Sequence, residues 1–265
     1  MTNLLLILFL NFFSAPSTYM RIPLEFSEEI PTLQVEIQGK PYSLILDLGV
    51  DCEFALKKDV LDNLPEKERI GTHTIISLEG EETTSTKYLF QSIRLKNGEI
   101  IHTIVEEDNK EFPDNVSGRI GRNILQTYNL FIDFSKSLLV VLKNFDDLKM
   151  EGYSIKDFRA IPFEITRWGA VFTIETDFGS KRFFINTHAP SAIRNPGKTE
   201  SQKVTTSKFK IGSIELGKTN LDIAEISPLL DDIDGYLGID FFKNHAIFFD
   251  YQNKKALLHF KANFP

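Results

Sequence analysis

An internal repeat is the feature of this sequence that most restricts how the chain can fold. The segment GRIGRNILQTYNLFIDFSKSLLVVL, which begins at Gly118, aligns without a gap with GYLGIDFFKNHAIFFDYQNKKALLHF, which begins at Gly235. Every aligned pair differs by 117 in residue number, and the pairs include Gly121 with Gly238, Phe131 with Phe248 and Asp133 with Asp250. A tandem match of this kind predicts two copies of one supersecondary unit.

Matching segments also lie upstream of each copy. VEIQGKPYSLILDLGV contains Asp47, and IETDFGSKRFFINTHA contains Asn186. Each segment reads as a strand, a turn with glycine and an apolar strand, which predicts a hairpin. Asp47 and Asn186 then sit at equivalent strand ends. A carboxylate at the end of a covered strand is costly unless it is used, although Asp47 could also simply cap its turn by accepting backbone N–H groups.

The first copy contains an insertion. The spacing from the apolar strand end to the glycine repeat is 71 positions in the first copy and 49 in the second. The additional residues fall mainly in GTHTIISLEGEETTSTKYLF, residues 71–90, where an alternating strand is followed by Glu79, Gly80 and a polar return. This pattern predicts a projecting hairpin, or flap, with Glu79 and Gly80 at its turn.

The segment between the two copies is charged and has few apolar residues. It reads NFDDLKMEGYSIKDFRA from Asn144, and a composition of this kind is typical of a domain boundary. The predicted units are an N-terminal lobe, residues 19–150, and a C-terminal lobe, residues 151–265.

Residues 1–18 predict an export signal. An apolar run from Leu4 to Phe13 precedes several small residues, and it is too short to span a bilayer. No Lys or Arg precedes the run, and Pro16 follows the most obvious cleavage position, so a first strand and a start at Met20 are alternatives. The chain is expected to be periplasmic or secreted, with no membrane span.

Composition limits the classes of partner and cofactor. The 265 residues are 42% hydrophobic and 25% charged, which is sufficient for a globular core. The net charge of -7, without a basic stripe, argues against a nucleic-acid partner. The single Cys52 cannot form an internal disulfide, and the histidines at 73, 102, 245 and 259 lack metal-ligand spacing. No cofactor or metal is therefore expected.

The combined motifs resemble the retropepsin and pepsin family of aspartic peptidases. They are the Asp-x-Gly turn at Asp47, Leu48 and Gly49, the flap, the apolar-Gly motif and the downstream apolar-Asp-aromatic motif, most of them repeated in tandem. The resemblance covers nearly all of the chain after residue 30. It implies an all-β fold of two retropepsin-like β-barrel lobes, related by a pseudo-twofold axis within one chain, so that no oligomer is required. It also implies a peptide-binding cleft with residues 47 and 186 at its floor.

The second lobe departs from the family's catalytic motif. The resemblance implies one carboxylate from each lobe, sharing a proton, but the second lobe has Asn186, Thr187 and His188 in place of Asp-Thr-Gly or Asp-Ser-Gly. An amide cannot supply a proton, so the general acid/base contribution, about 10² to 10⁴ fold in rate, is expected to be lost. Leu48 lacks a hydroxyl, which leaves Thr187 to form half of the family's inter-lobe lattice. His188 replaces a glycine and is expected to fill the cleft floor.

Asp51 and His188 have open interpretations. The resemblance implies that an acid at position 51 contacts the backbone of a bound peptide, whereas a loop acid held by local N–H groups is the alternative. His188 beside Asp47 would make an Asp-His pair, but no Ser or Cys nucleophile stands at a compatible spacing, which favours a structural role.

Three functions are consistent with the sequence. The first is a catalytically impaired aspartic-peptidase-like protein whose cleft still binds an extended peptide by strand addition. The second is an active aspartic endopeptidase that hydrolyses peptide bonds with an activated water, using Asp47 and an acid from elsewhere. The third is a non-enzymatic structural or partner-binding protein without an open cleft. Asn186 opposite Asp47 favours the first.

Overall fold

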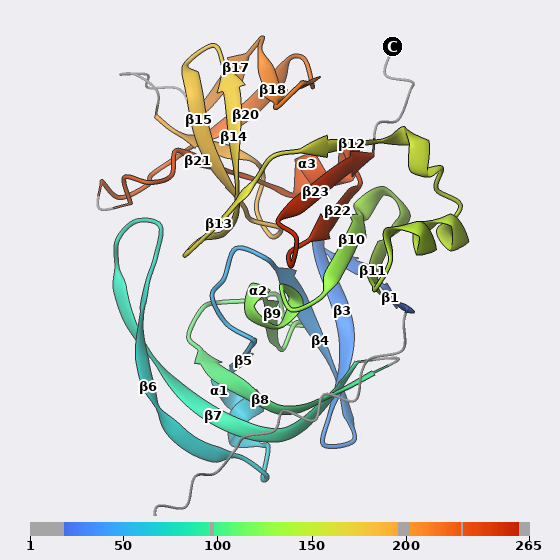
Figure 1. Ribbon diagram of the computed structural model, residues 1–265. Helices are drawn as coiled ribbons and strands as arrows, with labels where there is room; N and C mark the ends of the chain where they lie inside the picture. The colour runs from blue at the N-terminus through green and yellow to red at the C-terminus, as the bar shows by residue number, and fades with distance from the viewer. Residues whose placement is uncertain (1–18, 96–97, 196–201, 229, 260–265) are drawn as a thin grey trace, which may run out of the picture.

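The computed structural model describes residues 19–95, 98–195, 202–228 and 230–259, so the predicted export signal lies outside the described residues. The described residues form three β-sheets (Figure 1), which confirms the predicted all-β class. The helices are α1 (Lys58–Asp62), α2 (Arg122–Leu125) and α3 (Ile239–Asn244), with 3-10 turns η1 (Phe134–Lys136), η2 (Phe145–Glu151) and η3 (Ile155–Asp157). None of the helices in this described part is long and apolar enough to cross a lipid bilayer.

The first sheet, which we call the first lobe together with its connections, has eight strands in the order β2-β3-β4-β9-β5-β8-β7-β6. The strand bounds are β2 (Glu25–Ser27), β3 (Ile30–Ile37), β4 (Lys40–Asp47), β5 (Phe54–Lys57), β6 (Glu68–Ile76), β7 (Glu82–Leu95), β8 (Gly98–Asp108) and β9 (Gly118–Gly121).

The second sheet, which we call the second lobe together with its connections, has nine strands. Eight follow the order β17-β20-β16-β21-β15-β14-β18-β19, and β13 pairs with β14. The strand bounds are β13 (Glu164–Thr166), β14 (Gly169–Thr176), β15 (Gly179–Ile185), β16 (Ala192–Arg194), β17 (Lys203–Thr206), β18 (Phe209–Ile211), β19 (Ile214–Glu215), β20 (Thr219–Ala224) and β21 (Gly235–Leu237).

The third sheet joins the two halves of the chain. Its six strands lie in the order β1-β11-β10-β22-β23-β12. Their bounds are β1 (Tyr19–Pro23), β10 (Asn129–Asp133), β11 (Leu138–Leu142), β12 (Phe158–Ile161), β22 (Ile247–Asp250) and β23 (Lys255–His259). In Figure 1 this sheet lies on the right, where green and red strands meet beside both lobes.

The pairing of strands at the centre of the third sheet follows the predicted pseudo-twofold axis. β10 and β22 pair antiparallel there, with Phe131 opposite Phe248. These two residues are also equivalent in the sequence repeat. The flanking pairs, Leu130 with Phe249 and Ile132 with Ile247, exchange under the repeat, so a local twofold axis passes between Phe131 and Phe248. The repeat in the sequence is therefore a symmetry of the fold.

The glycines of the repeat are needed because other backbone crosses them closely. A Cβ on Gly121 would lie 2.4 Å from the carbonyl oxygen of Cys52, and a Cβ on Gly238 would lie 2.2 Å from that of Ala189. Contacts this short with backbone cannot be relieved by moving a side chain. The same requirement in both lobes explains why the two glycines match in the repeat.

Asp47 is the last residue of strand β4 and is buried in the interior of the molecule. The strand lies between β3 and β9, and its last four residues, Leu44–Asp47, are all buried. A strand covered on both faces reads as a continuous apolar run, which is the pattern that precedes Asp47 in the sequence.

Strands β6 and β7 form the predicted flap. They pair antiparallel up to Ile76 opposite Glu82, and Glu79 and Gly80 lie in the connecting turn. The turn reaches the second lobe, where the Leu78 carbonyl accepts a hydrogen bond of 2.7 Å from the backbone N–H of Ser227. Leu78 packs against an apolar cluster that includes Val171, Phe184, Ile226, Leu230 and Ile233. Figure 1 shows the hairpin curving up the left side to the underside of the second lobe.

Candidate active site

Asp47 and Asn186 come together where the two lobes meet. Asp47 ends β4, which pairs with β9, and Asn186 follows β15, which pairs with β21 in the same parallel manner. Gly49 lies against both side chains, because a Cβ built on it would be 3.2 Å from Oδ1 of Asp47 and 3.2 Å from Cγ of Asn186. Asp47 is 1% exposed and Asn186 is 5% exposed. Both side chains are therefore almost completely shielded from solvent.

Thr187 ties the second lobe to the first. Its hydroxyl donates a hydrogen bond of 2.6 Å to the Leu46 carbonyl and accepts one of 3.0 Å from the Leu48 N–H. Leu48 returns no such bond, and its side chain is buried in the core. One half of a reciprocal lattice is therefore present, as the resemblance implied for a chain with Leu at position 48.

The carboxylate of Asp47 is fully engaged. Its Oδ1 accepts a hydrogen bond of 2.9 Å from the Gly49 N–H. Its Oδ2 accepts one of 2.9 Å from Arg119 and lies 3.0 Å from Nδ1 of His188. Burial alone would raise the pKa of Asp47, but His188, Arg119 and the Gly49 amide together hold that pKa well below its usual range. Asp47 is therefore an ionised, hydrogen-bonded group.

Arg119 is held between two carboxylates. Its Nε lies 2.6 Å from Oδ2 of Asp108, and its Nη1 donates the hydrogen bond to Asp47. The guanidinium carbon lies 4.9 Å from the centre of the Phe112 ring, and the side chain is 6% exposed. Burial would lower the pKa of Arg119, but the charges of Asp47 and Asp108 outweigh burial and raise it. Arg119 is therefore a charged group beside Asp47.

Arg119 was not among the residues predicted from the sequence to form the site. It lies in GRIG, the four residues of β9, all of which are buried. A charged residue in an otherwise apolar buried strand was the available signal, because a buried cation requires a partner. The repeat adds a second signal, since Arg119 aligns with Tyr236.

His188 lies directly beside Asp47. Its side chain is 33% exposed, and Nδ1 faces Asp47. The described contacts place no Ser or Cys nucleophile against the ring. The geometry of His188 is that of a group that pairs with the carboxylate.

Asp51 lies at the rim of the floor. Its side chain is 69% exposed and lies 3.1 Å from Arg122. Arg122 also donates hydrogen bonds of 3.0 Å to the Gly49 carbonyl and 2.7 Å to the Arg167 carbonyl. Arg122 thus fixes the turn after Asp47 against the second lobe, and the exposed carboxylate of Asp51 faces solvent.

Glu106 is a second buried acid, beneath the flap strands. Its carboxylate lies 3.5 Å from Lys87 and 3.5 Å from His73. Burial raises the pKa of Glu106 to about 7 despite the nearby Lys87. Its ion-pair partners belong to the flap strands, so Glu106 does not form an acid pair with Asp47 in this arrangement.

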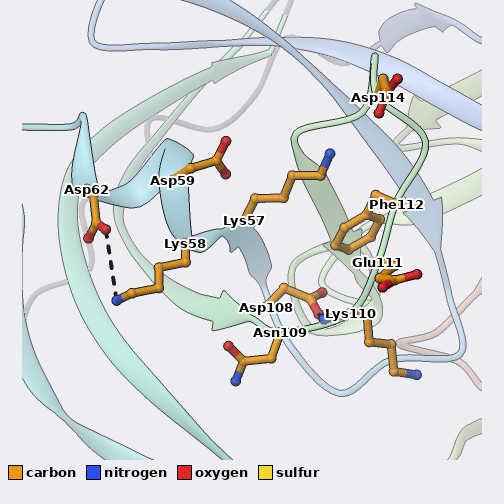
Figure 2. Close-up of a pocket in the computed structure, with 10 residues that line it drawn as sticks. All are labelled: Lys57, Lys58, Asp59, Asp62, Asp108, Asn109, Lys110, Glu111, Phe112 and Asp114. Atoms are coloured by element: carbon orange, nitrogen blue, oxygen red, sulfur yellow. Dashed lines mark hydrogen bonds and ion pairs between the residues drawn. The ribbon is translucent and has the colours of Figure 1, made fainter.

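A surface pocket of about 710 Å³ opens on the first lobe. Figure 2 shows its walls, which are the end of β5 with α1 and the loop from Asp108 to Asp114. Lysines and acids alternate around it, including Lys58 and Asp62, which form an ion pair of 3.9 Å. Asp108 and Phe112, which hold Arg119, are part of this wall. The mixed charges favour no particular class of ligand, and no group of three or more His, Cys, Asp or Glu in the described parts of the chain could hold a metal ion.

No protein-family model matches the chain, and no curated protein matches it in sequence. Solved structures do match. The aspartic proteinase of Irpex lacteus superposes with a TM-score of 0.65 at 12% identity, covering 92% of this chain and 98% of that one. The chain has the pepsin-like aspartic peptidase fold.

Two plant proteins share the pepsin-like fold with this chain. Basic 7S globulin from soybean superposes with a TM-score of 0.62 at 10% identity, over 92% of this chain and 95% of the globulin. Conglutin gamma, a basic 7S globulin from lupine seeds, superposes with a TM-score of 0.62 at 9% identity, over 93% of this chain and 95% of the conglutin. The predicted fold is confirmed, and at these identities the likeness extends to the fold alone.

Proposed function

We propose that this chain is a pepsin-like protein that has lost acid-pair catalysis and binds an extended peptide between its lobes. The observation that supports the proposal is the floor of the site. Position 186 is an amide, and the one carboxylate opposite it is held by Arg119 and His188.

The loss of catalysis follows from the proton balance of the reaction. Peptide hydrolysis by an acid pair needs one carboxylate that takes a proton from water and one that donates a proton to the carbonyl. Asn186 performs neither step. Asp47 is kept ionised by hydrogen bonds from the Gly49 N–H and Arg119, and its Oδ2 also lies 3.0 Å from Nδ1 of His188. A fold shared by a proteinase and by proteins described as globulins is consistent with a change of function on one scaffold.

Peptide binding does not depend on the acid pair. An extended peptide is held mainly by main-chain hydrogen bonds to strand edges, and the flap is a long antiparallel hairpin above the floor. The exposed carboxylate of Asp51 and the part-exposed ring of His188 supply polar groups beneath it. The contact between Leu78 and Ser227 joins the flap tip to the second lobe, and in this proposal the flap opens there to admit a peptide.

A disulfide across the flap tip tests peptide binding. A Cβ on Gly80 would lie 3.0 Å from Cβ of Ser227, so the flap tip must shift outward by about 0.5 to 1 Å to reach the roughly 3.5 to 4.5 Å of a disulfide. In the double variant Gly80→Cys, Ser227→Cys, the reduced protein is expected to retain intact peptides from a library of short unstructured peptides. The oxidised protein is expected to retain at least roughly tenfold less peptide than the reduced protein, because its flap cannot open. Mass spectrometry of the eluted peptides gives both quantities.

Controls for this experiment are available in the same chain. The single variant Gly80→Cys carries the same backbone strain without the lock, and the natural Cys52 is buried and does not compete. Equal retention by the oxidised and reduced forms would refute binding under the flap and favour a partner-binding protein without an open cleft. Eluted fragments whose formation pepstatin prevents would instead favour the active endopeptidase.

A further inference from the structure

The two lobes carry different residues at the position of Arg119 in the repeat, and the difference affects the surroundings of Asp47. Its repeat equivalent, Tyr236, is a neutral residue whose ring packs 5.6 Å from that of Phe184. Arg119 instead extends to the carboxylate at the end of the neighbouring strand β4. The pseudo-symmetry of the fold is therefore broken at this position by a buried charge.

Three residues of the first lobe contact the Arg119 guanidinium. Asp108, at the end of β8, pairs with Nε, and Asp47, at the end of β4, accepts from a terminal nitrogen. The ring of Phe112 covers the guanidinium plane, a favourable arrangement for a cation. Two carboxylates and an aromatic ring thus surround the guanidinium, which favours its position beside Asp47.

We infer that Arg119, clamped by Asp108 and Phe112, is a positioning residue that withholds the Asp47 carboxylate from acid/base chemistry. The inference rests on the proposed function and extends it, since it assigns the loss of catalysis to a fourth position besides Leu48, Asn186 and His188. A chain restored at those three positions alone would still carry a cation against one member of its acid pair. A nearby cation favours the doubly ionised state of two carboxylates and so opposes the sharing of one proton between them.

The first test is the titration of the Asp47 carboxyl, followed by carbon NMR on selectively labelled full-length protein. In the natural protein the Asp47 carboxyl is expected to titrate well below the usual range of an aspartate. In Arg119→Met, the midpoint is expected to rise by at least about one pH unit, a tenfold change in the protonation constant. Arg119→Met combined with Asp108→Asn provides a second variant that leaves no unpaired partner acid, in case the single variant does not fold. Arg94→Met is the matched control, because Arg94 pairs with Glu36 on the surface.

The second test compares two restored proteins in peptide cleavage between about pH 3 and 6. The triple variant is Leu48→Thr, Asn186→Asp, His188→Gly, and the quadruple variant adds Arg119→Ile. The quadruple variant is expected to cleave roughly 10² fold faster or more, which is the lower end of a general acid/base contribution. Equal cleavage by the two, or an unchanged Asp47 titration in the Arg119 variants, would overturn the inference. Pepstatin-sensitive cleavage by the natural protein would instead overturn the proposed function, so the two failures are distinguishable.

Discussion

Replacement of Asp47 by Asn is expected to lower the free energy of unfolding by about 3 kcal/mol. The substitution preserves shape but removes a buried charge that Arg119 and His188 both face. Removing one partner of a buried ion pair leaves the other uncompensated in a poorly solvated position, and such changes cost about 3 to 5 kcal/mol. Because Asp108 continues to pair with Arg119 in this variant, the expected loss of stability lies at the lower end of that range. Chemical denaturation at neutral pH measures the effect.

Asp51→Asn is the control for this prediction. It makes the same chemical change four residues further along the chain, at a side chain that is mostly exposed and pairs with Arg122. Exposed ion pairs contribute about 0 to 1 kcal/mol, so this variant is expected to unfold nearly as the natural protein does. If Asp47→Asn is equally harmless, the carboxylate is not a structural group of the floor.

The dependence of stability on pH has a definite sign. A carboxyl whose pKa is lowered by folding contributes stability above its unfolded pKa, and this contribution is lost as the pH falls through the folded value. The pKa of Asp47 lies below its usual value of 3.8 in the folded protein. Its contribution is therefore complete at neutral pH and declines progressively as the pH falls through and below the usual value of 3.8. The acid limb of the stability curve is expected to flatten in Asp47→Asn.

Replacement of Thr187 by Val is expected to cost about 2 to 4 kcal/mol. Val has nearly the shape of Thr but has no hydroxyl, so the Leu46 carbonyl and the Leu48 N–H would lose their shared partner. Each unsatisfied buried backbone group costs about 1 to 3 kcal/mol. The bonds cross from one lobe to the other, so the loss is expected to weaken the contact between the lobes as well as the fold.

Thr187→Ser separates the hydroxyl from the methyl group. Ser keeps both hydrogen bonds and is expected to retain most of the stability, within about 1.5 kcal/mol of the natural protein. Equal destabilisation by Val and Ser would show that packing of the methyl group, and not the hydroxyl, is what matters at this position.

Much of the fold could be predicted because the repeated segments of the sequence occupy symmetry-equivalent places in the structure. Two glycines match because backbone crosses both of them, and Phe131 matches Phe248 because the axis lies between these residues. The apolar run before Asp47 predicted a strand covered on both faces, and β4 is such a strand. The insertion in the first copy predicted the flap. These features are encoded locally, in periodicity and turn chemistry.

The partners of Asp47 could be predicted only in part. His188 adjoins Asn186 in sequence, so its place at the floor follows from the aligned motif. Arg119 and Asp108 are distant in sequence from Asp47, and the order of strands β4, β9, β5 and β8 brings Arg119 to Asp47 and Asp108 to Arg119. The contact of the flap tip with Ser227 likewise depends on how the lobes are joined. Long-range ion pairs and inter-lobe contacts leave no periodic trace in a single sequence.

Incubation of the natural protein with a mixed peptide library between about pH 3 and 6 tests the central claim most directly, with fragments counted by mass spectrometry. We predict no hydrolysis above the buffer background, with or without pepstatin, because Asn186 supplies no proton and Asp47 is held by Arg119. Pepstatin-sensitive hydrolysis would contradict the account, since it would require a second acid that acts with Asp47.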